Sequence, residues 1–325
     1  MMASPQARDL LARAALMVAV YAIFAAMLPT YTSLKGGAAL LDGAVLTGLI
    51  ALGVGLTMIA GEMDLSVGSM AALCGVIAVK LAPSAGPMPA ILAVAAFAAG
   101  LGALQGLAIA WLRINSMIFT IGTLIGLRGI TLIASGETTV LIPFDRLAMT
   151  DGFAARFLVF SPLSLTLLAA ALAVGLFANR TLWGRELYAI GGGRAEARAA
   201  GVSIRRPIVL AFALSAGLAG LGGALLSLRS GSASPLGFEA VLLEAVAACL
   251  IGGVALQGGR GSIPGILCGL FALRFLISGI GGMGAPFWAQ SLATGALLII
   301  VIVVEALSRA IVARRALARR GASAT

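Results

Sequence analysis

The sequence predicts an all-α protein that crosses a membrane several times, and three observations lead to this fold class. Of the 325 residues, 61% are hydrophobic and 10% are charged, whereas soluble domains carry about 25% charged residues. The mean hydropathy is +1.09, and apolar stretches recur along the whole chain. These stretches lack the alternation that a β-barrel needs, and lipid favours helices because backbone groups must bond internally. A soluble domain, a disulfide scaffold and a disordered chain are excluded.

Ten apolar stretches approach the length of about 20 residues that a transmembrane helix needs. The predicted spans cover residues 11–30, 40–60, 67–82, 89–111, 117–134, 161–178, 207–227, 240–257, 263–282 and 286–307. The first follows a short segment with Arg8 and Arg13, so it resembles a signal peptide. Because nine more spans follow, we expect it to stay as a signal anchor. All ten form one transmembrane domain over residues 1–325.

Basic residues predict the orientation, because Lys and Arg concentrate in cytoplasmic loops. With both termini cytoplasmic, 15 of the 22 Lys and Arg residues lie inside, 5 lie outside and 2 lie within spans. Nine or eleven spans would put the basic tail, residues 308–325, outside. The net charge of +10 is therefore a topology signal. Charges spread over separate loops do not indicate a nucleic-acid partner.

The composition also limits the chemistry of the chain. There is no His, which excludes His-dependent triads and His-ligated zinc. The three Cys residues lie far apart in apolar runs, so we expect neither a metal site nor a disulfide. Neither Lys35 nor Lys80 lies in a G-x-x-x-x-G-K-[ST] motif, so this chain has no P-loop. We expect no cofactor in this chain, and any ATP has to be bound by another subunit.

Two loops are longer than the others. Residues 179–206 form the longest cytoplasmic loop and contain six Arg residues. Residues 135–160 form the longest outer loop and mix acidic residues with Phe, which predicts a short interfacial helix. Such loops usually carry partner contacts or gates. The alternative for the outer loop is a tether lying on the lipid headgroups.

The first motif, residues 61–69, reads GEMDLSVGS and lies between two apolar spans. Carboxylates at membrane depth need partners, water or a helix N-terminus. Asp64 and Ser66 suit the N-cap of a helix beginning near Val67, so one interpretation is a capped turn at the cytoplasmic face. The other is a broken helix beside a translocation path, with Glu62, Asp64 and Ser66 exposed to a polar solute.

The second motif, residues 183–202, reads WGRELYAIGGGRAEARAAGV and lies in the long cytoplasmic loop. A Gly-rich turn precedes a short helix rich in Ala, Glu and Arg, and Gly201 is expected to end that helix. This shape suits docking into a partner, and the alternative is a solvated connector. The third motif, residues 254–265, reads VALQGGRGSIPG. It lacks the Lys and the strand of a phosphate-binding loop, so it predicts a tight turn before a helix whose first turn contains Pro264.

These motifs resemble the permease subunits of ATP-binding cassette (ABC) sugar importers of the ribose, xylose and galactose group. Residues 61–69 are similar to the signature G-[GE]-[IM]-D-L-S-V-G-S of that family. Residues 115–123, NSMIFTIGT, with LRG at 127–129, resemble its N-x-[FL]-I-x-T-L-G-T…R-G segment. The second and third motifs resemble its inner loop and its G-G-x-G-[ST] turn, and PFWAQ at 286–290 resembles its late P-F-W-Q segment. The resemblance covers nearly the whole chain.

The resemblance implies a type II importer-like permease in the bacterial inner membrane. Its partners would be a second permease chain, identical or different, two P-loop ATPase chains that bind the ATP, and an extracytoplasmic sugar-binding protein. A helix near Ala195–Ala200 would couple the permease to the ATPase. The residues assigned to the coupling loop are Gly184, Arg185, Glu186, Tyr188, Gly191, Gly192, Glu196, Ala197, Arg198 and Gly201. Departures from the family pattern at Gly193 and Phe275 leave the solute open among pentoses, hexoses, polyols, nucleoside-like and signalling sugars.

Further polar residues within the spans are candidates for the translocation path. Asn115 and Thr120 either face the path or bond across helices. Arg128 either faces the path or extends to the outer membrane surface. Arg274 lies mid-span and either faces the path or pairs with Glu244.

Two other functions remain as alternatives at this point. A secondary transporter would need an ion site, for which Glu62 and Asp64 are candidates, but it would leave the inner loop unexplained. An intramembrane enzyme would need Ser with His or Lys, or a second Asp beside Asp64, and neither arrangement is evident.

Overall fold

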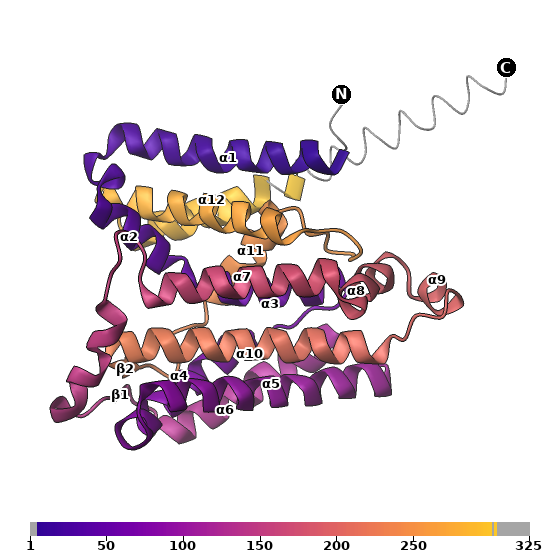
Figure 1. Cartoon of the computed structure of the whole chain (residues 1–325), viewed down its shortest axis with the longest axis horizontal. Helices are drawn as coiled ribbons and strands as arrows, with labels where there is room; N and C mark the ends of the chain where they lie inside the picture. The colour runs from indigo at the N-terminus through magenta and orange to yellow at the C-terminus, as the bar shows by residue number, and fades with distance from the viewer. Residues whose placement is uncertain (1–4, 301, 304–325) are drawn as a thin grey trace.

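A computed structural model describes residues 5–300 and 302–303, and its long helices run side by side through one bundle (Figure 1). The N-terminal half contains α1 (Pro5–Met27), η1 (Pro29–Thr32), α2 (Leu34–Gly43), α3 (Val45–Ile59), α4 (Val67–Ala85), α5 (Pro87–Leu112) and α6 (Ser116–Ser135). The C-terminal half contains β1 (Val140–Leu141), η2 (Phe144–Ala154), α7 (Pro162–Arg180), α8 (Leu182–Gly192), α9 (Arg194–Ala199), α10 (Arg205–Ser230), β2 (Ser232–Ala233), α11 (Val241–Ile251) and α12 (Ile263–Gly282). A last apolar helix covers Phe287–Ile300.

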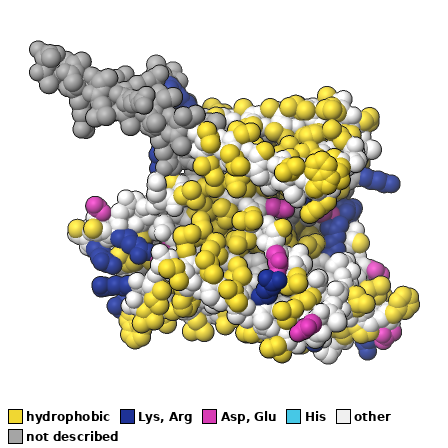
Figure 2. Space-filling model, turned by 180° about the vertical axis from the view of Figure 1, so that it is seen from behind, with side chains coloured by type: hydrophobic (Ala, Val, Ile, Leu, Met, Phe, Trp, Pro, Cys, Tyr) yellow, Lys and Arg dark blue, Asp and Glu magenta, His cyan; other side chains and the backbone are white. Residues whose placement is uncertain are grey.

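The predicted all-α membrane fold is confirmed. Within the described residues, eight helices are long and apolar enough to cross a membrane, and two shorter apolar helices occupy the positions of the eighth and tenth predicted spans. The predicted tenth span, 286–307, extends beyond the described residues, and the basic tail lies outside them. The surface in Figure 2 is mostly hydrophobic, as contact with lipid requires, but a few charged side chains lie in its middle.

Two predicted spans differ in detail from the structure. The span at 40–60 corresponds to the longer candidate span Leu34–Ile59, in which a turn at Ala44 separates α2 from α3. The span at 240–257 is only the 11-residue helix α11, and residues 234–240 before it are not helical. Hydropathy could not separate these cases, because an apolar turn next to a short helix has the same mean hydropathy as one full helix.

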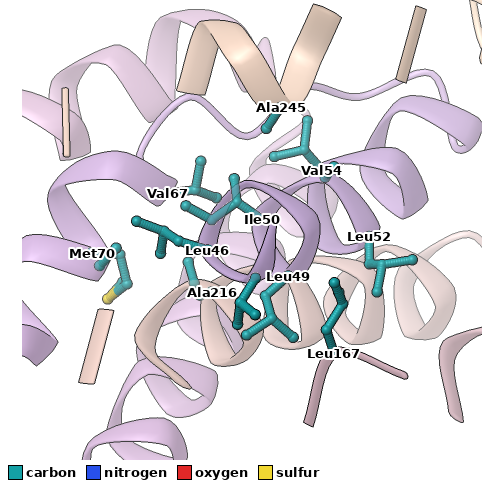
Figure 3. Packing of buried hydrophobic residues seen from close by; sticks show 14 of the residues in the cluster. Leu46, Leu49, Ile50, Leu52, Val54, Val67, Met70, Leu167, Ala216 and Ala245 are labelled. Carbon is teal, nitrogen blue, oxygen red and sulfur yellow. The ribbon is translucent and has the colours of Figure 1, made fainter. Parts of the chain in front are cut away.

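The helix α3 forms the centre of the bundle, and every one of its residues is buried. It contacts α10, α11 and α7. Figure 3 shows Leu49 near Leu167 of α7 and Ala216 of α10, while Val54 lies near Ala245 of α11. An apolar helix without a polar face is expected at such a position.

The two ends of the bundle differ (Figure 1). One end, called here the α9 end, carries α8, α9 and the start of α1. The opposite end, called the sheet end, carries the antiparallel pair of β1 and β2. The expected short helix of the loop 135–160 is present as the 3-10 helix η2.

A buried ion cluster ties the elements at the sheet end together. The Asp42 carboxylate is 2.8 Å from the Arg156 guanidinium and 2.9 Å from that of Arg229, and it also accepts a hydrogen bond from Ser161. These residues come from α2, the loop after η2, the end of α10 and the start of α7. Because buried charges need such partners, the cluster fixes the positions of four segments that are far apart in the sequence.

Candidate functional site

The first motif forms an interruption between α3 and α4, called here the first interruption (residues 60–66). Asp64 in this segment is bonded to Ser215, which lies ten residues after the start of α10. At 1.5 Å per residue, this is about 15 Å along that helix. The interruption therefore lies inside the bundle. Of the two interpretations of the first motif, the capped turn at the cytoplasmic face was wrong.

The Asp64 carboxylate is fully buried and accepts three hydrogen bonds. The donors are the Ser66 backbone N–H at 3.1 Å, the Ser66 hydroxyl at 2.7 Å and the Ser215 hydroxyl at 2.9 Å. Ser66 stands at the N-cap of α4, but its side chain makes no capping bond. The expectation that these side chains cap α4 in the usual way was wrong, because Asp64 instead ties the start of α4 to α10.

The helix α6 holds the backbone of the first interruption. The Ser116 hydroxyl accepts a hydrogen bond from the Met63 N–H at 3.1 Å, and the Thr120 hydroxyl accepts one from the Leu65 N–H at 3.2 Å. These contacts satisfy backbone groups that no helix serves. Asn115, by contrast, is the N-cap of α6, and its side chain accepts hydrogen bonds from the first turn of that helix.

Glu62 links the first interruption to the α9 end. Its buried carboxylate forms an ion pair with Arg194, the first residue of α9, whose side chain is about half exposed. Partial burial, and then the positive charge of Arg198, lower the pKa of Arg194. A guanidinium remains charged in proteins. The pair therefore joins the first motif directly to the second.

Backbone contacts between glycines strengthen this junction. The glycine cluster consists of Gly61, Gly191, Gly258 and Gly259, one or two from each of the three motifs. The Gly259 N–H donates to the carbonyl of Ile59 at 2.8 Å. A Cβ atom on Gly258 would lie 2.7 Å from the backbone of Gly61 and 2.9 Å from that of Gly191. Three segments far apart in the sequence thus touch without any side chain between them.

The second motif forms α8 and α9. The predicted docking helix, about Ala195–Ala200, is α9, and only Ala197 of its six residues is buried. The helix ends as expected at Gly201, which has a φ of +80°. The Gly201 N–H donates to the Arg198 carbonyl and the Val202 N–H to that of Ala197, both at 2.9 Å, which is a Schellman cap. The helix is therefore short, fixed and open to contact.

The other predicted loop residues belong to α8 or its end. Gly184 is buried against the end of α7, where a Cβ atom would lie 2.6 Å from Ala178. Arg185 and Gly192 are exposed, and Glu186 is partly buried. Tyr188 packs against the core, and burial raises the pKa of its phenol.

Residues 234–240, called here the second interruption, were not predicted as part of the site. They connect β2 to the short helix α11 and meet the first turn of α4. A Cβ atom on Gly68 would lie 3.0 Å from the carbonyl oxygen of Phe238. The two interruptions, which are about 170 positions apart in the sequence, therefore face each other across α4.

An ion pair and a cavity lie between the interruptions. The guanidinium of Arg128 is 3.0 Å from the carboxylate of Glu239, with the two side chains 45% and 54% exposed. A cavity of about 200 Å³ is lined by this pair and by Leu65, Gly68, Ser69, Leu124 and Leu242. Arg128 thus reaches across to the second interruption. The single sequence signal for Glu239 is that it is an acidic residue just before an apolar run.

Arg274 lies apart from this cavity. Its guanidinium packs against Gly43, where a Cβ atom would find no room. Among the described residues, no ion pair joins Arg274 to Glu244, and Glu244 instead accepts a hydrogen bond from Thr47 at 3.1 Å. An ion-pair contact with Glu244 is therefore absent from the described part of the chain, although the two charges lie close enough to interact electrostatically.

Comparisons with known proteins agree on one family. Residues 38–302 match the family model described as branched-chain amino acid transport system, permease component. The autoinducer 2 import system permease protein of Klebsiella pneumoniae is 33% identical, with 91% of this chain and 86% of that protein covered. The ribose import permease protein of Escherichia coli K12 is 28% identical, with 89% of this chain and 91% of that protein covered. The xylose transport system permease protein of the same strain is 29% identical, with 86% of each chain covered.

Proposed function

Because this chain belongs to the branched-chain amino acid transport system permease component family, we propose that it is the membrane-spanning subunit of an ATP-driven importer for a monosaccharide or sugar-like solute. The observation that carries this proposal is the junction of α9 with the first interruption. An exposed, firmly capped helix is bonded through Glu62 and Arg194 to a break in the helical core. This is the arrangement needed if a separate ATPase drives movement within the membrane.

The proposed mechanism is alternating access driven through α9. The ATPase subunit binds ATP and moves α9 as it closes. The Glu62–Arg194 pair and the glycine cluster pass this movement to the first interruption, because both contacts are direct. Asp64 then connects the interruption to α10 and thus to the rest of the bundle. Many transporters place their solute sites at helix interruptions of this kind.

The α9 end is proposed to face the cytoplasm, together with both termini. The loops that carry most of the Arg residues support this, since basic residues favour the cytoplasmic side. The sheet end would then receive the extracytoplasmic sugar-binding protein. Its rigid ion cluster around Asp42 supports a docking role, because a docking surface must keep its shape.

A second permease chain, identical or different, is proposed to cover α6. The buried residues of α6 form one stripe, and the opposite face presents Gly122 and Gly126 with open space above them. Glycines four residues apart allow close approach of two membrane helices. The half-exposed Arg128 also needs protein or water rather than lipid on this side.

Gentle extraction of the tagged chain from native membranes tests the proposal. Mass spectrometry is expected to find a P-loop ATPase in a roughly equal amount and to show whether one or two kinds of permease chain are present. Purified chain that moves solute into liposomes without ATP would contradict the proposal and favour a secondary transporter.

A further inference from the structure

We propose that the cavity between the two interruptions holds the solute during transport, and that Arg128 and Glu239 select an uncharged, polyhydroxylated molecule the size of one sugar ring. This inference rests on the proposed permease function and extends it to a binding site. It also assigns a role to Glu239, which lies in none of the three motifs.

The position of the cavity is the first argument. Non-helical backbone at membrane depth is tolerated where it lines a cavity or is covered by protein. Two such segments meet here, since Phe238 lies against Gly68 and both interruptions contribute cavity residues. Transporters place their solute sites where broken helices meet.

The charges are the second argument. Arg128 is the thirteenth of the 20 residues of α6, yet almost half of its side chain is exposed. Glu239 is similarly exposed. A charged pair facing lipid would be costly, whereas a pair facing a water-filled cavity is not. The exposure of both side chains therefore favours water, a polar solute or a protein neighbour over lipid at this cavity.

The chemistry of the lining is the third argument. Arg128 offers several N–H donors and Glu239 offers carboxylate acceptors, which together match hydroxyl groups that both donate and accept. The pair is neutral overall, so it gives no advantage to an anion or a cation. Leu65, Leu124 and Leu242 provide apolar walls for the C–H faces of a ring. The volume of about 200 Å³ is below the roughly 300–1,000 Å³ of sites for drug-sized ligands.

Charge-selective labelling of a cysteine in the cavity tests the proposal. In the purified complex, Ser69→Cys is treated with an anionic and a cationic methanethiosulfonate of similar size. Ser84→Cys, an exposed position on the same helix, is the matched control. The unsubstituted chain measures labelling of Cys74, Cys249 and Cys268, of which the first two are buried. We expect both reagents to reach Ser69→Cys, and we expect D-ribose, D-xylose or D-galactose to slow this reaction at least threefold.

Removing one charge at a time should change the ratio of anionic to cationic labelling in opposite directions. Misfolding would not produce opposite changes. Glu239→Gln should raise the ratio of anionic to cationic labelling at Ser69→Cys by about tenfold. The Coulomb interaction of one nearby unit charge with a charged reagent corresponds to a rate ratio of that order. Arg128→Gln should lower the ratio by a similar factor, and the double variant should restore it. The ratio at Ser84→Cys should not change.

Failure of this inference is distinguishable from failure of the proposed function. If the ATPase co-purifies but Ser69→Cys is not labelled, or none of the three sugars slows its labelling, the binding site is wrong and the permease function stands. If Ser69→Cys behaves as expected but no ATPase co-purifies, the cavity stands and the ATP-driven mechanism fails. Equal effects of both single substitutions on the ratio would also overturn the assignment.

Discussion

At the scale of the residue, the arrangement around Asp64 determines how α4 begins. Its carboxylate accepts hydrogen bonds from two serine hydroxyls and one backbone N–H, all of them buried. Such a network is stabilising when complete and costly when one member is missing. The role of Asp64 is therefore to hold the first interruption in place against α10.

Replacing Asp64 with Ala should destabilise the protein as much as it impairs transport. Each buried polar group left without a partner costs about 1–3 kcal/mol, so thermal unfolding in detergent should occur several degrees lower and the membrane yield should fall. The same replacement at Asp151, which is exposed, should change neither property. Normal yield and stability with no uptake would contradict this and favour direct contact of Asp64 with the solute.

Glu62 and Arg194 provide a second test at this scale. Arg194→Glu places two carboxylates at the junction, and Glu62→Arg places two guanidinium groups there, so each change should reduce uptake by about tenfold or more while the ATPase still co-purifies. The double exchange restores opposite charges and should recover much of the loss. ATP hydrolysis and uptake are measured in the same proteoliposomes, because an uncoupled complex hydrolyses ATP without transport. Additive losses in the double variant would show that the two side chains do not act as a pair.

At the scale of the element, α9 is anchored by one side and exposed on the others. Ala197 packs beside Ile190 and Ile208, while Glu196 and Arg198 face away from the bundle. A helix of this kind can change its surface charge without losing its fold, so its contacts with a partner can be altered selectively.

Exchanging the charges of α9 by Glu196→Arg with Arg198→Glu should weaken binding of the ATPase and reduce uptake. The reason is that both side chains lie on the exposed surface that we assign to docking. The matched control for ATPase binding is Asp145→Arg with Arg146→Asp, an exposed pair at the sheet end, which should leave co-purification of the ATPase unchanged. Co-purified ATPase is quantified against the tagged chain. Unchanged co-purification and uptake would remove α9 from the interface.

The elements also show what sequence reasoning can and cannot reach. Hydropathy located every apolar segment that the structure describes, and the capping residue Gly201 was correct because a helix end depends on local chemistry. The second interruption was missed, since partial helices and full spans have similar composition. The pairing of Arg128 with Glu239, and the cluster around Asp42, depend on contacts between distant segments that one sequence does not reveal.

At the scale of the whole molecule, the exposed face of α6 is the surface most suited to a second chain. It combines open glycines with large apolar side chains, including Ile118, Ile121 and Ile125. The same face borders the cavity at Arg128. Pairing of two permease chains there would enclose the cavity between them and leave the α9 helices at one end of the pair.

Cross-linking tests this pairing. The variant Gly126→Cys should form a disulfide or a short bifunctional cross-link to a second permease chain in native membranes, because close helix approach brings backbones together. Leu92→Cys on the exposed part of α5 is the control and should not cross-link. Mass spectrometry of the product identifies the partner as identical or different. Cross-linking only at Leu92→Cys would place the second chain on another face.

The glycine cluster has a practical consequence for how this protein is studied. Its contacts are made by backbone atoms, so no side chain can be deleted there to weaken them. Replacing Gly191, Gly258 or Gly259 by alanine inserts a methyl group between segments that already touch. A systematic alanine scan would register the junction as a steric defect and would rank it with ordinary packing faults. Restoring space by a second substitution on the opposite segment is also ruled out, because glycine already faces glycine. Information about this joint has to come from changing its neighbours, Glu62 and Arg194.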